Sequence, residues 1–285
     1  MWICPDPLGH LQATGVDAAG RKQYLYHQLW RQRRDRAKFE QMLQFAAALP
    51  RLRRRARRDL RGDDLGRDRA MACALLLLDL GFFRIGSEGY AEQSGSYGLV
   101  TMLKRHVSVE RDGVVFDYEG KGGIRRVQAI ADPALREAVA ELKRRRGGGE
   151  RLLAYRDGRR WVELRSDDLN DTIKQRTGGD FSAKDFRTWN ATVLAAVAAA
   201  SLDAGAASKA ARRRTVNAAV EAAAAYLGNT PAVCRASYID PRVFDRFRAG
   251  QTVADTLARP LDSVDLATRS VREEVEAAVL ELIGS

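Results

Sequence analysis

The stretch HVSVERDGVVFDYEGKGGIRRVQAI, residues 106–130, interrupts a chain in which helical patterns dominate. Apolar and polar residues alternate along it with a period of two, as in strands that bury one face. Two dipeptides that favour tight hairpins, Asp112-Gly113 and Gly122-Gly123, divide the stretch. It therefore predicts a three-stranded antiparallel meander.

Helical patterns precede this meander. Residues 29–49 place apolar side chains at helical spacing and end before Pro50, which predicts a first helix that the proline stops. A second predicted helix covers residues 51–60. A third, residues 65–80, is apolar nearly all round and is expected at the centre of the core. The predicted fold class is mainly α (α+β), a helical body with one small three-stranded antiparallel sheet.

Capping signals predict helices after the meander as well. Residues 133–146 predict a helix that ends in the glycines 147–149, and the rest of the chain is alanine-rich, without an internal repeat. Ser182 and Asp185 have the spacing of a capping box that opens a long helix. We therefore expect the remainder of the chain to be helical.

A predicted corner between two helices carries an amide and a phenol. A helix over about residues 208–227 is expected to stop at the glycine that follows it. Thr230 and Pro231 then supply an N-cap and a proline at the first helical position. Asn229 lies in the connecting loop, and Tyr238 falls near the end of the short helix. Tyr238 is either a packing residue at a helix end or a nucleophile that nearby cations serve.

The charge of the chain favours a polyanionic partner. Its 285 residues include 48 Lys and Arg against 37 Asp and Glu, a formal net charge of +11. Such an excess predicts attraction to nucleic acid first and to an anionic membrane surface second. Arginine runs at residues 52–58, 144–146 and 212–214 are either solvated faces or contacts to a duplex backbone.

Cysteines and apolar runs indicate an intracellular protein. Cys4, Cys73 and Cys234 are scattered and have no histidine pairs nearby, so they predict neither a disulfide framework nor a zinc site. The longest apolar run, residues 71–83, is too short to span a bilayer. The N-terminus lacks the pattern of a secretion signal. We expect a cytoplasmic protein.

Two single cations have alternative interpretations. Arg84 follows the most apolar helix and precedes a glycine-rich loop, so it is either a partner of the helix dipole or a fixed contact to an anion. Lys121 lies at the tip of a predicted hairpin. It is either a solvated lysine in a tight turn or a mobile ammonium that the hairpin delivers to a phosphate or a leaving oxygen.

A pair of cations opens a later helix. Lys184 and Arg187 lie three residues apart in the first turns of the helix after Ser182. They are either a surface charge pair around Asp185 or contacts to an anion, which a helix N-terminus already favours. The histidines are too dispersed for a metal site, and acidic pairs such as Asp63-Asp64 suit capping better than two-metal chemistry. No metal-dependent nuclease is expected.

Taken in chain order, these residues resemble a known enzyme family. The stretches RIGSEGYAEQSGSYGLVT (84–101), FDYEGKGG (116–123), SAKDFRTWNAT (182–192) and LGNTPAVCRASYIDP (227–241) are similar to those of type IB DNA topoisomerases of the small bacterial and poxvirus kind. The similarity runs from about Gly20 to Phe247. GRKQYLYHQLWR, residues 20–31, resembles the family's junction between an N-terminal β-sheet domain and the catalytic domain. The resemblance implies that residues 1–30 are a remnant of the former and residues 31–285 are the catalytic domain.

The resemblance also implies a role for each candidate. Tyr238 would attack a DNA phosphodiester and form a 3′-phosphotyrosyl link. Arg84 and Arg187 would hold the non-bridging oxygens, and Lys121 would protonate the leaving 5′-oxygen. Asn229 stands where many members carry histidine, so it would donate only a neutral hydrogen bond to a phosphate oxygen. Lys184 would contact DNA near the reacting phosphate. Arg235, one turn before Tyr238, is also expected to bind DNA and, with the other arginines, to supply the positive surroundings that the phenol needs.

The implied function is an ATP-independent relaxation of supercoiled duplex DNA, without a metal or any other cofactor. A monomer associated with the nucleoid is expected. Two alternatives stay open at this point. A tyrosine recombinase uses the same covalent chemistry, although it usually has His-x-x-Arg in place of Lys184-x-x-Arg187. A basic DNA-binding protein with a structural tyrosine would perform no catalysis.

Overall fold

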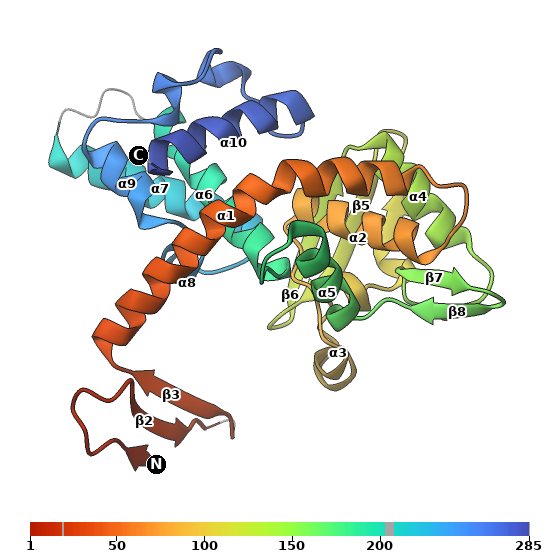
Figure 1. Ribbon diagram of the computed structural model, residues 1–285, viewed down its shortest axis with the longest axis horizontal. Coiled ribbons are helices and arrows are strands. Elements are labelled where there is room, and N and C mark those ends of the chain that lie inside the picture. Colours follow the sequence, from red (N-terminus) through yellow and green to blue (C-terminus); the bar gives the residue numbers. More distant parts are fainter. Residues whose placement is uncertain (19, 203–207, 285) are drawn as a thin grey trace. The chain divides into compact units, whose positions relative to one another are not determined.

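The computed structural model describes residues 1–18, 20–202 and 208–284 (Figure 1). The chain divides into two compact units, Met1–Gln44 and Phe45–Ser285, and the division falls inside the long helix α1 (Gln28–Leu60). The interpretation of residues 1–30 as the remnant of a separate domain stays a prediction. Among the described residues, no helix combines the length and hydropathy needed to cross a bilayer.

The first unit contains an antiparallel sheet. Strands β1 (Trp2–Ile3), β2 (Leu11–Val16) and β3 (Lys22–Tyr26) pair in chain order, and the first part of α1 follows them. The ring of Tyr26 stacks on that of Trp30 at 4.4 Å between centroids, and the Arg34 guanidinium lies 5.3 Å above the same indole. These stacked groups join the end of the sheet to the start of the helix.

The predicted helix break at Pro50 is wrong. Helix α1 runs without interruption through Pro50 to Leu60. An internal proline removes one backbone hydrogen bond and costs a helix about 3 kcal/mol. Leu49 and Leu52, on either side of it, are both 1% exposed. The burial of such side chains, which local sequence does not reveal, keeps the helix intact.

Helix α2 (Arg67–Gly81) is the centre of the second unit, as predicted. Its residues from Ala70 to Asp79 are buried without exception. It contacts α4 (Pro133–Arg144), α5 (Ser166–Thr177), α6 (Ala183–Ser201) and two of the strands that lie beside them (Figure 1). Because α2 is fixed on all sides, the chain that leaves its C-terminus starts from a rigid position.

The predicted meander is confirmed. Strands β4 (Val107–Val109), β5 (Val114–Gly120) and β6 (Ile124–Ile130) form an antiparallel sheet in that order. The glycines of the β5–β6 turn have positive φ angles of 81° and 71°. This turn carries Lys121. The mainly α (α+β) fold class is confirmed with it.

The prediction that only helices follow the meander is wrong. Strands β7 (Ala154–Asp157) and β8 (Arg160–Glu163) form a second hairpin, which turns at Gly158 with a φ of 57°. The Asp157-Gly158 dipeptide is a hairpin signal of the same kind as in the meander. A short helix, α3 (Glu88–Ser94), lies within the glycine-rich stretch after Arg84.

The capping predictions are confirmed. The side chains of Ser182 and Asp185 form a capping box at the start of α6. Ser208 caps α7 (Lys209–Leu227), and Thr230 caps α8 (Pro231–Ser237). The remaining elements are short 3₁₀ turns and two helices, which are listed with their bounds: Leu99–Thr101, Lys104–His106, Val253–Asp255, Leu261–Ser263, α9 (Pro241–Arg248) and α10 (Arg269–Gly284).

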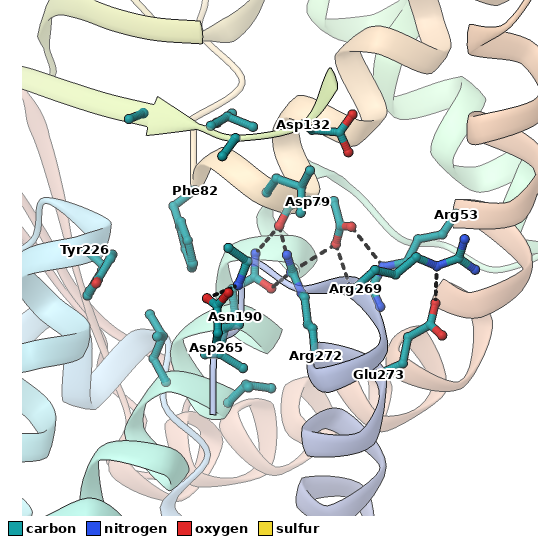
Figure 2. A pocket seen from close by; sticks show the side chains of 18 of the residues that line it. Arg53, Asp79, Phe82, Asp132, Asn190, Tyr226, Asp265, Arg269, Arg272 and Glu273 are labelled. Atoms are coloured by element: carbon teal, nitrogen blue, oxygen red, sulfur yellow. Dashed lines mark hydrogen bonds and ion pairs between the residues drawn. The ribbon is translucent and has the colours of Figure 1, made fainter. Parts of the chain in front are cut away.

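A buried ionic cluster joins four helices of the second unit. Figure 2 shows Arg53 of α1 and Arg272 of α10 converging on Asp79 of α2, with Asn190 of α6 beside them. Arg53 binds both oxygens of the Asp79 carboxylate at 2.8 Å and also binds Glu276 at 2.8 Å. Burial alone would raise the pKa of Asp79, but Arg272 and Arg53 outweigh it and hold that pKa below its ordinary value. The carboxylate is therefore ionised in the folded protein.

Replacing Asp79 by alanine should destabilise the protein strongly. The change leaves buried guanidinium charge without its carboxylate, which typically costs about 3–5 kcal/mol of unfolding free energy. Urea denaturation of Asp79→Ala and of the parent chain measures this loss. Asp117→Ala is the matched control, since Asp117 pairs with Arg125 while their side chains are 45% and 73% exposed. That variant should lose at most about 1 kcal/mol, and equal losses in the two variants would contradict the role given to the cluster.

Candidate active site

The site is built around the C-terminus of α7. Gly228 adopts the left-handed conformation that often ends helices, with a φ of 62°. Its N–H donates to the carbonyl of Ala225 at 3.3 Å, and the N–H of Asn229 donates to Ala224 at 3.1 Å. This corner leads directly into α8. It leaves the carbonyl of Ala225 with only the long bond from Gly228 and the carbonyls of residues 226–228 with no backbone partner among the described residues, as is usual at a helix end.

Three guanidinium groups bind these carbonyls, and each comes from a different element. Arg84 follows α2, Arg126 belongs to β6, and Arg187 belongs to α6. The C-terminus of a helix carries partial negative charge, so cations are stabilised there. The bonds are Arg126 Nη1 to Ala225 O at 3.1 Å, Arg126 Nη2 to Tyr226 O, Arg187 Nη2 to Leu227 O at 2.9 Å and Arg84 Nη2 to Gly228 O at 3.2 Å.

Arg187 is the most deeply buried of the three and is 3% exposed. Its Nη1 donates to the carbonyl of Phe82, which ends α2 in a left-handed conformation with a φ of 55°. The pKa of the Arg187 guanidinium is lowered to about 10, first by burial and then by the charge of Arg84, with Tyr238 opposing the shift. The group stays charged at neutral pH. Its buried Nε has no hydrogen-bond partner among the described residues.

The orientation of Asn229 is set by Arg84. The Nη2 of Arg84 donates to the Oδ1 of Asn229, so the amide oxygen is occupied. The buried Nδ2 of Asn229 has no acceptor in the part of the chain that the structure describes. An unpaired buried donor is costly unless a bound group completes it. The amide is therefore held with a free donor.

Tyr238 lies beneath the Arg187 guanidinium. It ends α8, where its N–H donates to Cys234 at 2.9 Å and its carbonyl accepts from the Thr192 hydroxyl at 3.3 Å. The centre of the Arg187 guanidinium is 5.3 Å from the centroid of the tyrosine ring. Tyr238 is half-buried, so its ring is held from one side and reachable from another.

This arrangement suits an anion. None of Arg84, Arg126 and Arg187 forms an ion pair with a carboxylate whose position is described, although most buried arginines of this protein do. Their donors bind neutral carbonyls, and two further donors, Arg187 Nε and Asn229 Nδ2, are unpaired. Guanidinium groups match the geometry of phosphate oxygens. The arrangement can therefore bind a phosphate next to a phenol.

Three other predicted residues lie apart from this group. Lys121, at the β5–β6 turn, is exposed and makes no hydrogen bond or ion pair with any described side chain. Lys184 is exposed in the first turn of α6. Arg235 is exposed on α8, and its guanidinium lies 5.5 Å from the ring centroid of Phe244 rather than over Tyr238. The structure thus brings together Arg84, Arg187, Asn229 and Tyr238 only.

Two residues of the site were missed in the sequence. Arg126 is described above, and Tyr118 lies directly opposite it on β5. Burial raises the pKa of the Tyr118 phenol, although Arg126, Arg187 and Arg84 oppose the shift. A signal for Arg126 was present, because it alternates with Gln128 and Ile130 on the less exposed face of its strand. A cation on the inward face of a strand needs a partner.

A pocket of about 610 Å³ in the second unit borders this site, since Phe82 and Tyr226 are among the residues that line it. Figure 2 shows its lining, which includes Asp79, Arg272 and Asn190, but not Arg84, Arg187 or Tyr238. Several of its charged side chains pair with one another, as Arg269 does with Glu273 at 2.8 Å. No group of three or more His, Cys, Asp or Glu side chains that could hold a metal occurs within the described ranges.

Comparisons with known proteins agree with the geometry. Residues 27–254 match the family model of the eukaryotic DNA topoisomerase I catalytic core. DNA topoisomerase 1B of Acanthamoeba polyphaga mimivirus is 30% identical over 198 residues, which cover 68% of this chain and 58% of the viral protein. DNA topoisomerase 1B of Vaccinia virus (strain Copenhagen) is 22% identical over 116 residues, or 41% of this chain and 37% of that protein.

The chain thus spans less than two thirds of the length of these curated relatives. The family match covers most of the chain and includes every residue of the α7–α8 corner and of the three elements that supply its guanidinium groups. The chain belongs to the type IB DNA topoisomerase family, in the region of the catalytic core.

Proposed function

We propose that the protein relaxes supercoiled duplex DNA by transient cleavage of one strand through a 3′-phosphotyrosyl intermediate. One observation carries the proposal: Arg187 lies over the Tyr238 ring and Arg84 binds Asn229 at the same helix end, and two donors of this group, Arg187 Nε and Asn229 Nδ2, have no described partner. The names of the viral relatives support the same activity. We further propose that the protein acts as a monomer on duplex DNA in the cytoplasm, at the nucleoid of a bacterial cell.

In the proposed cleavage step, the Tyr238 oxygen attacks a backbone phosphorus. A Tyr238 Oη–P bond forms, the bond from phosphorus to the 5′-oxygen breaks, and the phenolic proton leaves to solvent. A phenol has a pKa near 10, so neighbouring cations are needed to make it an effective nucleophile. Arg187, centred 5.3 Å from the ring, and Arg84 supply this charge.

The guanidinium groups and the amide also stabilise the transition state. Arg84 and Arg187 balance the charge that develops on the non-bridging oxygens, and Asn229 Nδ2 donates one neutral hydrogen bond. Prearranged donors of this kind typically contribute several kcal/mol to a rate. They occupy the place that metal ions take in other phosphoryl-transfer sites. The phosphotyrosyl ester keeps the energy of the broken bond, so resealing after strand rotation needs no ATP.

Lys121 completes the reaction as general acid in this proposal. Its ammonium donates a proton to the 5′-oxygen as the P–O bond breaks. The exposed position of Lys121 is that of the protein without DNA, and catalytic hydrogen bonds often form only in the complex. Lys184 and Arg235, both exposed, are proposed as contacts to the DNA backbone near the reacting phosphate.

Relaxation of a supercoiled plasmid in EDTA without ATP tests the function. A topoisomerase relaxes the plasmid, a recombinase acts only on paired specific sites, and a non-catalytic binder only shifts the mobility of the DNA. An inactive wild-type chain that still binds the plasmid would contradict the proposal.

Tyr238→Phe should abolish cleavage and leave DNA binding intact. The change removes only the attacking oxygen, and loss of a nucleophile typically lowers a rate by at least about 10⁴-fold. Covalent adducts on a nicked suicide substrate, resolved by denaturing gel, measure the loss. Tyr155→Phe, on β7, is the matched control and should cleave like the wild type. A covalent adduct formed by Tyr238→Phe would refute the nucleophile.

Lys121→Ala should slow cleavage about 10²- to 10⁴-fold, the usual contribution of a general acid. A substrate with a 5′-thio leaving group should restore the rate, because a thiolate leaves without protonation. Single-turnover cleavage of matched 5′-oxygen and 5′-thio substrates measures both rates. If sulfur gives no rescue, Lys121 is not the general acid.

Asn229→Asp should reduce cleavage more than Asn229→Ala. Both variants lose the Nδ2 donor, and the aspartate also places negative charge beside the phosphate and beside Arg84. Loss of one such donor typically costs about 10²-fold. Single-turnover rates at saturating enzyme separate this effect from weaker binding. Equal rates in wild type, Asn229→Ala and Asn229→Asp would show that the amide does not contact the phosphate.

A further inference from the structure

We infer that Arg126 is a positioning residue, which anchors the β5–β6 hairpin and its Lys121 to the α7–α8 corner. The inference rests on the proposed function, since it assigns Arg126 a task in delivering the general acid. It concerns a residue that contacts neither Lys121 nor Tyr238 through a described bond.

The first observation is the pair of bonds that Arg126 makes. Its Nη1 and Nη2 donate to consecutive carbonyls of α7, Ala225 at 3.1 Å and Tyr226. The planar fork of a guanidinium can bind two neighbouring acceptors at once, whereas an ammonium acts as a point charge. These carbonyls lie at the negative end of the helix. The strand is thus fixed to the helix in position and in direction.

The second observation is the close approach at Gly228. A Cβ atom on this residue would lie 2.5 Å from the Arg126 Nη1 and 2.7 Å from its guanidinium carbon. Real Cβ atoms essentially never make non-bonded contacts this short, so the guanidinium fills the space that a side chain would need. Gly228 immediately precedes Asn229. The Arg126 guanidinium therefore lies against the corner itself and not only against the helix.

The third observation is a second tie from the same hairpin to the site. Tyr118 donates its hydroxyl to Gln128 Oε1 at 2.9 Å, and Gln128 Nε2 donates to the carbonyl of Gly81 at the end of α2. The next residue of the chain is Phe82, whose carbonyl accepts from Arg187. The base of the hairpin is thus joined to both helix ends that hold Arg187.

Arg126 is placed to act through the hairpin rather than on the phosphate. Both of its Nη atoms are used by carbonyls in this structure. Its cross-strand neighbour Tyr118 precedes Lys121 by three residues, roughly 10 Å along a strand. A change of angle at this base moves the tip, and a misplacement of about 1 Å can cost a catalytic group 10²-fold in rate.

The test compares two leaving groups in single-turnover cleavage. Arg126→Ala should slow cleavage of the 5′-oxygen substrate by about 10²-fold and leave the 5′-thio substrate nearly unchanged, since sulfur leaves without Lys121. The double variant Arg126→Ala/Lys121→Ala should be no slower than Lys121→Ala alone. Equal slowing of both substrates, or additive losses in the double variant, would overturn the inference.

Two further variants keep the test decisive. Arg125→Ala is the matched control, because Arg125 precedes Arg126 on the same strand but pairs only with Asp117 on the exposed face. It should cleave both substrates at wild-type rates. Arg126→Lys keeps the charge but lacks the planar fork that fixes the strand against both carbonyls. It should show the same selective defect to a smaller degree, and a wild-type rate on both substrates would overturn the inference.

Failure of the proposed function is distinguishable from failure of this inference. A wild-type chain that cleaves neither substrate would remove the proposed function and the task of Arg126 with it. A wild-type chain that cleaves both, next to an Arg126→Ala variant without leaving-group selectivity, would remove the inference alone.

Discussion

The carbonyl end of α7 is the interaction on which the rest of the site depends. Arg84, Arg126 and Arg187 carry like charges and would repel one another if they were brought together without compensation. Four consecutive carbonyl oxygens, residues 225–228, accept their hydrogen bonds and supply the negative end of a helix dipole. The repulsion is thereby offset without a carboxylate. A carboxylate would also have offset it, but it would have competed with a phosphate for the same donors.

The buried ionic cluster fixes α2 and α6, the two helices next to the arginines that bind this end of α7. Asp79 lies on α2 only five residues before Arg84, and Asn190 lies on α6 only three residues after Arg187. The amide of Asn190 donates to the carbonyl of Asp79 at 3.0 Å, and both residues bind Arg272. The two helices next to Arg84 and Arg187 are therefore fixed to each other within about one turn of these guanidinium groups. Small relative movements of α2 and α6 are opposed by charge pairing among these buried side chains.

Much of the secondary structure could be predicted from local chemistry, and most of the site could not. Hairpin dipeptides and caps such as Ser182 and Thr230 are local signals, and the structure follows them. The continuity of α1 through Pro50 depends on packing with distant residues, which no local pattern contains. Local patterns left Arg84, Arg187 and Tyr238 with two interpretations each, and only the resemblance to a family grouped them, since their convergence depends on where separate elements meet. Arg126 was missed because an arginine in a strand is read as solvated until its inward face is recognised.

Arg187 has a structural role and, in the proposed function, a chemical one. It holds the end of α2 through Phe82 and the end of α7 through Leu227, and it also lies over the ring of Tyr238. These contacts bury the Arg187 guanidinium within the chain itself, so the proposed reaction would start from a cation that is already desolvated. Substitution of residue 187 would therefore be opposed twice, once through the contacts that hold two helix ends and once through the proposed reaction. A lineage that abandoned catalysis would still be under pressure to retain this arginine.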